Sequence, residues 1–140
     1  MVIGIIGENC SGKSTLADAI KNAIGAEIYT GKDYLRIAKS ESEATVLFSA
    51  KLREAISGNN IIYVISEKEH LQFLPDDAVR ILVKADLDTI KQRFRTRMRG
   101  NLPVPVEKML ENKHGMFDNG TYDFYFDGVC GDPQTICNML

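Results

Sequence analysis

Short apolar runs alternate along this chain with stretches in which apolar residues recur every three or four positions. Runs rich in β-branched residues predict buried parallel strands, because a strand covered on both faces is apolar throughout. The longer spacing predicts amphipathic helices that pack against those strands. Strands are expected at residues 2–6, 27–29, 61–65, 79–83 and 122–126.

Helices are expected in the intervals between these strands. The first helix follows Gly12, presents Leu16, Ile20 and Ile24 on one face, and stops at Gly25. Later helical segments are expected at 33 to about 56, 67–73, from Asp86 to about 100, from Val106 to about 113, and after Asp132. Regular alternation of strand and helix predicts an α/β protein with a parallel sheet, built as a single domain over residues 1–140.

The segment between the first strand and the first helix carries a phosphate-binding loop motif. Its sequence GENCSGKS matches the pattern G-x-x-x-x-G-K-S/T at every fixed position. The glycines let the backbone approach phosphate oxygens, the loop amides form an anion-binding nest, and the following helix directs its positive dipole end at the same place. The motif predicts a nucleoside triphosphate site formed by Gly7, Glu8, Asn9, Cys10, Ser11, Gly12, Lys13, Ser14 and Thr15.

Two side chains of the motif predict the cofactors ATP and Mg²⁺. Lys13 supplies a positive charge for the β- and γ-phosphates, and the Ser14 hydroxyl is placed to ligate Mg²⁺. Glu67 is the acid nearest to the end of the third strand. It is therefore the candidate for orienting water on Mg²⁺, and Asp33 competes with it for this role.

Composition and charge exclude several other classes of protein. The chain is 44% hydrophobic and 26% charged, as in ordinary globular proteins, and its formal net charge of −2 argues against extended nucleic-acid binding. No apolar run approaches membrane-spanning length, and no targeting segment is expected because the first strand begins at Val2. Three cysteines without metal-ligand spacing are typical of reduced thiols, so a cytoplasmic location is expected. The oligomeric state is left undetermined.

A second candidate site follows the second strand. Ligands of parallel sheets bind at the carboxyl ends of the strands, and this strand is followed by Thr30, Gly31, Asp33 and Arg36. The Arg36 guanidinium could make a bidentate contact with the phosphate or carboxylate of an acceptor. The same residues also fit an ordinary helix start, with Asp33 as a first-turn acid and Arg36 in a surface ion pair. Position alone does not decide between these interpretations.

Four arginines alternate along the helix that Asp86 caps, namely Arg93, Arg95, Arg97 and Arg99. At 100° per residue, the first and third share one side of the apolar stripe, and the second and fourth share the other. Such a run is usually a solvated basic face. Phosphoryl transfer, however, depends on cations beside the transferring group, and the run ends at a loop that could fold over a nucleotide. We therefore expect at least one of the four to act on the phosphates.

These features together resemble the small nucleoside monophosphate kinases of the adenylate kinase type. In that family a T-G-D-x-L-R-x-A segment holds the acceptor nucleotide, and residues 30–38, TGKDYLRIA, are similar to it with one extra residue, Lys32. The resemblance implies that Thr30 and Gly31 border the acceptor base and that Arg36 grips its phosphate. It also implies that Arg93 and Arg97 act near a lid.

The resemblance extends to the architecture. It implies a three-layer P-loop NTPase fold with a five-stranded parallel sheet in the order 2-3-1-4-5. An acceptor-binding helical insert is expected at about 31–58 and a short lid at about 97–115. The chain departs from the family after the third strand, where residues 66–69 read SEKE in place of an aspartate and a G-F-P-R-type segment.

The sequence thus predicts a small kinase that transfers the γ-phosphoryl group of ATP to a small-molecule acceptor, with a nucleoside monophosphate as the first choice. The predicted catalytic residues are Lys13, Asp33, Arg93 and Arg97. Two alternatives stay open. One is a kinase for a non-nucleotide metabolite of the shikimate or gluconate type, whose acidic acceptor residue Asp33 could supply. The other is a nucleotide-binding module without transfer activity, which the missing acid after the third strand favours.

Overall fold

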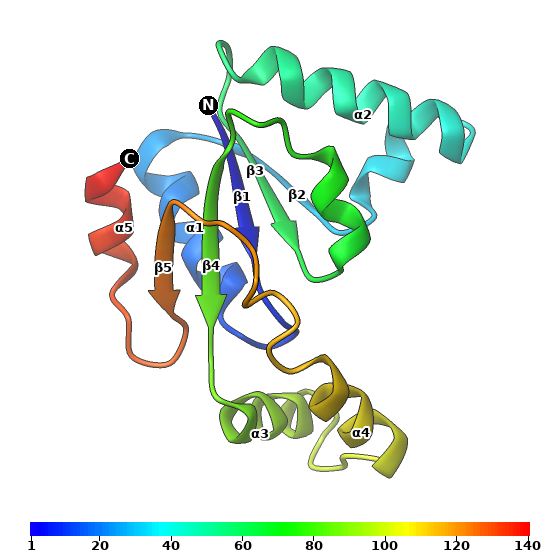
Figure 1. The fold of residues 1–140 in the computed structure, drawn as a ribbon, viewed down its shortest axis with the longest axis vertical. Helices are drawn as coiled ribbons and strands as arrows, with labels where there is room; N and C mark the ends of the chain where they lie inside the picture. Colours follow the sequence, from blue (N-terminus) through cyan, green and yellow to red (C-terminus); the bar gives the residue numbers. More distant parts are fainter.

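The computed structural model describes all 140 residues and shows a parallel sheet with helices on both faces (Figure 1). The strands are β1 Val2–Ile6, β2 Glu27–Thr30, β3 Ile61–Ile65, β4 Val79–Lys84 and β5 Phe124–Asp127. The α-helices are α1 Lys13–Ile24, α2 Glu41–Ala55, α3 Leu87–Arg97, α4 Val104–Lys113 and α5 Pro133–Met139. Two 3₁₀ helices span Asp33–Ile37 and Lys68–Phe73. None of the helices has both the length and the apolar character that crossing a bilayer requires.

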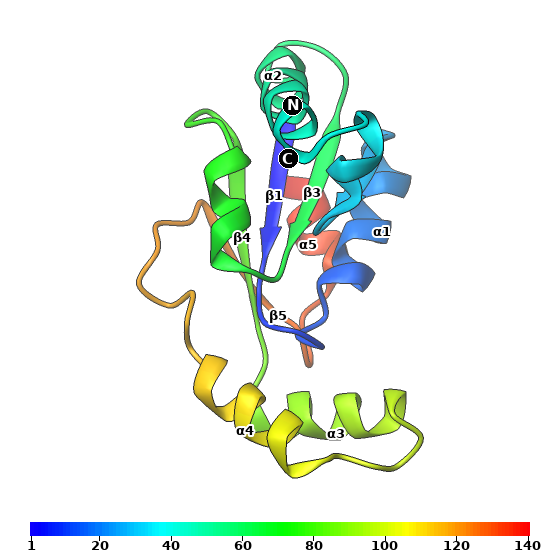
Figure 2. The same cartoon turned by 90° about the vertical axis from the view of Figure 1, so that its right-hand side faces the viewer.

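The five strands lie in the order β2-β3-β1-β4-β5, and every neighbouring pair is parallel, so the predicted fold class and strand order are confirmed. The central strand β1 is buried along its whole length, with Ile5 opposite Val64 of β3 and Ile81 of β4. Since all strands run the same way, their carboxyl ends share one edge of the sheet. Helices α3 and α4 lie beyond that edge, and both chain termini lie towards the other end (Figures 1 and 2).

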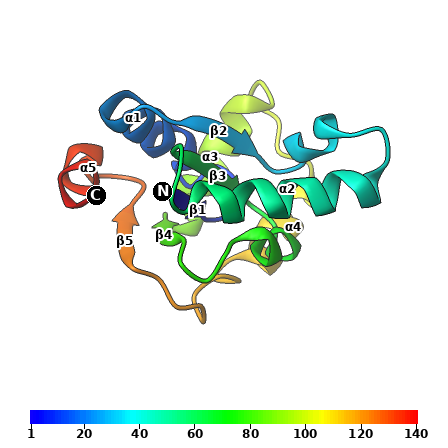
Figure 3. The same cartoon turned by 90° about the horizontal axis from the view of Figure 1, so that it is seen from above.

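Alternate residues of the central strands point to two separate cores. On one face, Ile3 and Ile5 pack with Leu16 and Ile20 of α1 and with Ile136 of α5. Helices α1 and α5 lie side by side on that face, away from α2 (Figure 3). Full burial of such side chains contributes about 1.5–3 kcal/mol each. This packing fixes the start of α1 directly after the phosphate loop.

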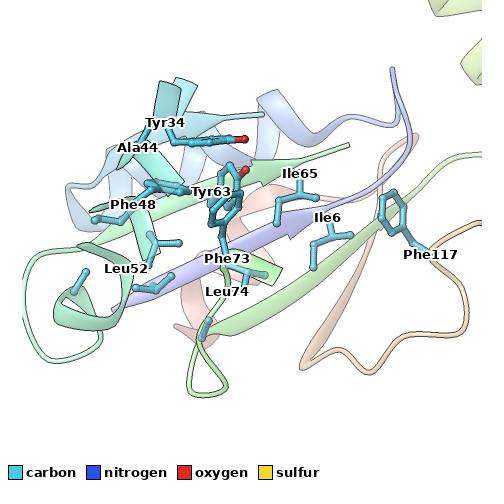
Figure 4. Close-up of a cluster of buried hydrophobic side chains, with 14 of the residues drawn as sticks. Ile6, Tyr34, Ala44, Phe48, Leu52, Tyr63, Ile65, Phe73, Leu74 and Phe117 are labelled. Carbon is cyan, nitrogen blue, oxygen red and sulfur yellow. The ribbon is translucent and has the colours of Figure 1, made fainter. Parts of the chain in front are cut away.

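The other core is built around aromatic rings (Figure 4). Phe48 of α2 stacks on Tyr34 of the first 3₁₀ helix at 5.5 Å and meets the Tyr63 ring edge-on at 5.0 Å. Gly4 of β1 leaves room for Leu74 in this core, because a Cβ at Gly4 would lie 2.5 Å from a Leu74 methyl carbon. The segments that follow β2 and β3 are therefore held against the sheet by apolar packing.

Several boundaries differ from the sequence predictions for local reasons. The helical stretch predicted at 33–56 is interrupted where Ser40 caps α2 by accepting a hydrogen bond from the Glu43 amide. Helix α3 ends at Arg97, because Arg99 and Gly100 adopt positive φ angles of 59° and 88°. The prediction that Arg99 lies on this helix is thus wrong. Strand β5 was predicted at 122–126, but it begins two residues later, at Phe124, and ends at Asp127.

Candidate active site

The phosphate loop joins β1 to α1 at the carboxyl edge of the sheet. The Gly7 amide continues the sheet by donating to the Ile65 carbonyl at 3.1 Å. Both glycines of the motif stand where a side chain would not fit. A Cβ at Gly7 would lie 2.6 Å from the Val83 carbonyl oxygen, and Gly12 has a φ of 109° and packs against Gly128. Tertiary contacts therefore require these two glycines as much as the loop turn does.

The loop forms the floor of a cleft of about 530 Å³. Its walls come from five parts of the chain that are distant in sequence, because the ends of β2 and β3 both contribute. They are the loop and helix start at 9–15, the strand ends at Thr30, Val64 and Ser66, the α3 residues Arg93 and Arg97, and the segment 126–133 after β5. The side chains around the cleft include one lysine, two arginines and no Asp, Glu or His. The cleft therefore suits an anion.

Lys13 is the cation at the centre of the loop. Its side chain is buried, with the residue only 6% exposed, and Nζ donates to the Glu8 carbonyl oxygen at 2.6 Å. Burial lowers the pKa of Lys13 from 10.5 to about 8, and the Arg97 charge also lowers it, whereas Cys10 and Glu8 oppose the shift. Desolvation of a charged amine is unfavourable, so a phosphate at this position would be bound strongly.

Ser11 gives a second indication that the loop is built for an anion. The residue is 1% exposed and lines the cleft, and its hydroxyl oxygen has no hydrogen-bond partner. An unpaired buried hydroxyl costs about 1–3 kcal/mol. A phosphate oxygen in the loop would satisfy it. Of the nine residues predicted to hold the triphosphate, seven line the cleft, and Gly7 and Glu8 do not.

The arginines of α3 differ in what they contact. Arg93 donates from Nη1 to the Cys10 carbonyl at 3.0 Å and from Nη2 to the Gly128 carbonyl at 2.8 Å. It therefore joins the phosphate loop to the segment after β5. Arg97 lines the same cleft and makes no hydrogen bond or ion pair, so its guanidinium is available to a ligand. Arg95 contacts Gln92 and lies outside the cleft.

The residues after β2 mostly make hydrogen bonds and ion pairs with one another. The Asp33 carboxylate accepts from the Thr30 amide at 2.9 Å and pairs with Arg36 at 2.6 Å, and the Arg36 side chain is 79% exposed. Gly31 accepts from the Tyr63 hydroxyl at 2.8 Å. Only Thr30 of the four predicted acceptor residues lines the cleft. An acceptor would have to draw Arg36 away from Asp33 in order to use it.

Glu67 does not occupy the position expected of it. Its carboxylate pairs with Lys113 of α4 at 3.0 Å, and the neighbouring residue Ser66 lines the cleft instead. No group of three or more His, Cys, Asp or Glu side chains could hold a metal by itself. Mg²⁺ prefers oxygen ligands and keeps several waters and phosphate oxygens. The Ser14 and Ser66 hydroxyls fit this requirement, and Ser14 remains the predicted ligand.

The segment after β5 is the part of the site that the sequence indicated least. Gly128 packs so closely on the phosphate loop that a Cβ there would overlap the Ser11 carbonyl. Its amide donates to the Lys84 carbonyl at 2.7 Å. Gly131 and Pro133 continue the wall of the cleft. The signal in the sequence was the position of Asp127 and Gly128 at the end of a strand, at the edge where ligands bind.

Comparison with known proteins supports the fold but no closer relationship. No family model matches the chain, and no curated protein matches it. Among solved structures, an uncharacterized protein from Eubacterium ventriosum is 17% identical with a TM-score of 0.67, covering 99% of this chain and 94% of that one. A shikimate kinase from Acinetobacter baumannii in complex with shikimate is 14% identical with a TM-score of 0.64, covering 99% and 89%.

A third solved structure is the deoxyadenosine kinase from M. mycoides with bound dATP. It is 17% identical with a TM-score of 0.58, covering 99% of this chain and 96% of that one. These kinases share the architecture of the chain over nearly its whole length, and the phosphate loop lies at the edge of the sheet where their fold class binds ligands. The chain therefore has the fold of the small P-loop kinases.

Proposed function

We propose that this protein is a kinase that transfers the γ-phosphoryl group of ATP to a small acceptor, and that the acceptor is a nucleoside monophosphate. The observation that carries the proposal is the charge of the cleft. Lys13 and Arg97 converge on the phosphate loop, and no carboxylate lines the cleft beside them. Catalysis of phosphoryl transfer is mostly positioning and charge stabilisation, which such a set of cations supplies.

The missing carboxylate bears on the acceptor. A hydroxyl acceptor must lose a proton, and a carboxylate usually accepts it. A phosphate monoester is already an anion, so its oxygen can attack without a base. Asp33 accepts a hydrogen bond from the amide of the cleft residue Thr30 and Glu67 follows the cleft residue Ser66, and each of these two acids is held in an ion pair. This arrangement favours a phosphate over a sugar or cyclitol hydroxyl.

In the proposed reaction, a phosphate oxygen of the acceptor attacks the γ-phosphorus and the bond to the β–γ bridging oxygen breaks, giving ADP and a diphosphate product. Lys13, the Ser11 hydroxyl and the loop amides hold the phosphates, and Arg97 neutralises the transferring group. Mg²⁺ held by Ser14 would balance charge on the β- and γ-oxygens. Thr30, Gly31 and Arg36 would position the acceptor.

A second candidate is a kinase for a hydroxyl acceptor such as a cyclitol or sugar acid. The position of Asp33 favours it, because this carboxylate lies directly after β2 and accepts from the amide of Thr30, which lines the cleft. Release of Arg36 would free Asp33 to act as a base. A module that binds nucleotide without transferring phosphate remains the third interpretation.

The test is ADP formation with MgATP across a panel of nucleoside monophosphates, nucleosides, shikimate and gluconate, with Lys13→Met as the control. Stimulation by one or more monophosphates, abolished in Lys13→Met, is the expected result. Stimulation by a hydroxyl acceptor alone would reject the monophosphate proposal and select Asp33 as the base. Tight ATP binding with no turnover on any acceptor would identify a binding module.

A further inference from the structure

Glu8, the second residue of the phosphate loop, makes contacts that its position in the motif does not suggest. Its carboxylate accepts from the Gly115 amide at 2.9 Å, and its other oxygen lies 2.9 Å from Nδ1 of His114. The side chain is 15% exposed. An ionised carboxylate only accepts hydrogen bonds, so His114 donates from Nδ1. The phosphate loop is therefore tied to the residues directly after α4.

The direction of the Glu8 side chain has an electrostatic reason. A carboxylate beside bound phosphates would repel them, and Glu8 is the only acid in the loop. Its side chain turns out of the cleft and finds donors on the far side. The charge is thus kept from the phosphates only while His114 and Gly115 stay in place. Through these two contacts, the conformation of the phosphate loop depends on the position of α4, and the position of α4 depends on the loop.

Helices α3 and α4 form one unit, which we call the α3–α4 hairpin (Leu87–Lys113). Lys91 of α3 pairs with Glu111 of α4 at 2.7 Å and with Glu107 at 3.3 Å. The hairpin carries Arg93 and Arg97 into the cleft. The C-terminal end of the hairpin is held in two ways. Lys113 pairs with Glu67, and Gly115, two residues further on, donates to the Glu8 carboxylate. A shift at that end would move the arginines with it.

We propose that Glu8 is a positioning residue that couples the filling of the phosphate loop to the placement of the α3–α4 hairpin, an inference that rests on the proposed kinase function. The Glu8 carbonyl accepts from Lys13 Nζ at 2.6 Å. The Lys13 ammonium has three N–H donors, so it can hold the Glu8 carbonyl and a phosphate oxygen at the same time, and a bound triphosphate therefore fixes the Glu8 peptide. The Glu8 carboxylate in turn holds Gly115, whose φ of 80° few other residues would adopt, and so fixes the chain directly after α4.

The experiment compares the wild-type 140-residue chain with Glu8→Ala, Glu8→Gln and the charge-matched control Glu54→Ala, an exposed acid on α2. Calorimetry measures the affinity for a non-hydrolysable ATP analogue with Mg²⁺. Amide hydrogen exchange of Val104–Lys113 is followed with and without the analogue, and kcat and KM are measured with the active acceptor. His114→Ala removes the Glu8–His114 contact and leaves Glu8 in place. If Glu8→Ala does not fold, the His114→Ala variant tests the coupling in its place.

In the wild type and Glu54→Ala, the analogue should slow exchange across α4. In Glu8→Ala, kcat should fall about tenfold, the affinity should stay within about threefold, and the exchange response should be lost. Glu8→Gln should restore most of both, because its amide oxygen can still accept from Gly115. His114→Ala should show a smaller loss of the same kind.

Three results would overturn the coupling. One is an unchanged exchange response in Glu8→Ala, and another is Glu8→Gln behaving like Glu8→Ala. The third is an equal loss of kcat and affinity, which would mean that Glu8 only shapes the loop. Failure of the wild type to bind the analogue would reject the kinase proposal itself. A wild type that binds and turns over without any dependence on Glu8 would reject the coupling alone.

Discussion

Replacing Lys13 with methionine should stabilise the ligand-free protein at neutral pH. Methionine keeps the length and apolar stem of the side chain and removes the buried charge. Burial holds the pKa of Lys13 at about 8 against 10.5 for an exposed lysine. One pKa unit corresponds to about 1.4 kcal/mol, so the charged form costs the folded state about 3 kcal/mol. The lost bond to the Glu8 carbonyl offsets about 1 kcal/mol of this.

The sign of the pH dependence follows from linkage. Between about pH 8 and about pH 10.5, the unfolded chain keeps the Lys13 proton and the folded protein has lost it. The unfolded state thus binds more protons, and the free energy of unfolding rises with pH in this window. The rise belongs to Lys13 alone, so it appears as a shrinking difference between the wild type and Lys13→Met.

The assay is urea denaturation of the wild type, Lys13→Met and Lys21→Met at intervals from about pH 7 to about pH 10. Lys21→Met is the control, because Lys21 lies exposed near the end of the same helix. Near pH 7 the Lys13→Met variant should be more stable than the wild type by about 2 kcal/mol. Towards pH 10 this advantage should fall by about 2–3 kcal/mol. Parallel curves for the wild type and Lys13→Met would refute the argument.

The same group predicts the opposite trend for binding. Phosphate binds the ammonium form, so the affinity of the wild type for MgATP should fall by up to about tenfold per unit above about pH 8. In Lys13→Met the affinity should be weak and nearly independent of pH in this range. Titration calorimetry in each buffer measures both.

Three further predictions concern arginines. Arg97→Ala should lower kcat by about 10²-fold or more with little change in ATP affinity, because its unpaired guanidinium acts mostly in the transition state, whereas Arg95→Ala should be nearly silent; equal effects would contradict this distinction. Arg93→Ala should lower the free energy of unfolding by about 2 kcal/mol and weaken ATP binding, since two carbonyls lose a charged donor; an unchanged thermal midpoint would argue against that role. Arg36→Lys should raise the acceptor KM by about tenfold and leave the ATP KM unchanged, because an ammonium cannot reproduce a bidentate contact; steady-state kinetics with both substrates decides it.

Much of the fold could be predicted from the sequence, because the patterns that indicate its strands and its phosphate loop are local. The apolar run Val2–Ile6 is short and rich in β-branched residues, which favours a strand buried on both faces without reference to the rest of the chain. The phosphate loop is equally local, since all its fixed positions fall within eight residues. The residues at which helices end were harder to predict. The end of α3 at Arg97 depends on left-handed residues that include a non-glycine, Arg99.

The residues on the rim of the cleft could be predicted only in part. Both Ser66 and Glu67 follow β3, and the sequence favoured the acid because acids orient metal-bound water. The structure places Ser66 at the cleft and pairs Glu67 with Lys113, which lies 46 residues further along the chain. A pairing at that separation leaves no trace in local spacing.

The sequence by itself determined the class of fold, the order of its elements and the position of the phosphate loop, because hydrophobic period and motif spacing act within one turn or one strand. Tertiary structure alone decided how the charges are used. It assigned Arg93 to two backbone carbonyls and left Arg97 open to a ligand, although both lie on one side of α3. It also turned Glu8 away from the cleft towards Gly115. A long charged side chain takes its partner from whatever packing brings within reach, and that is fixed only when the sheet, α3 and α4 are in place.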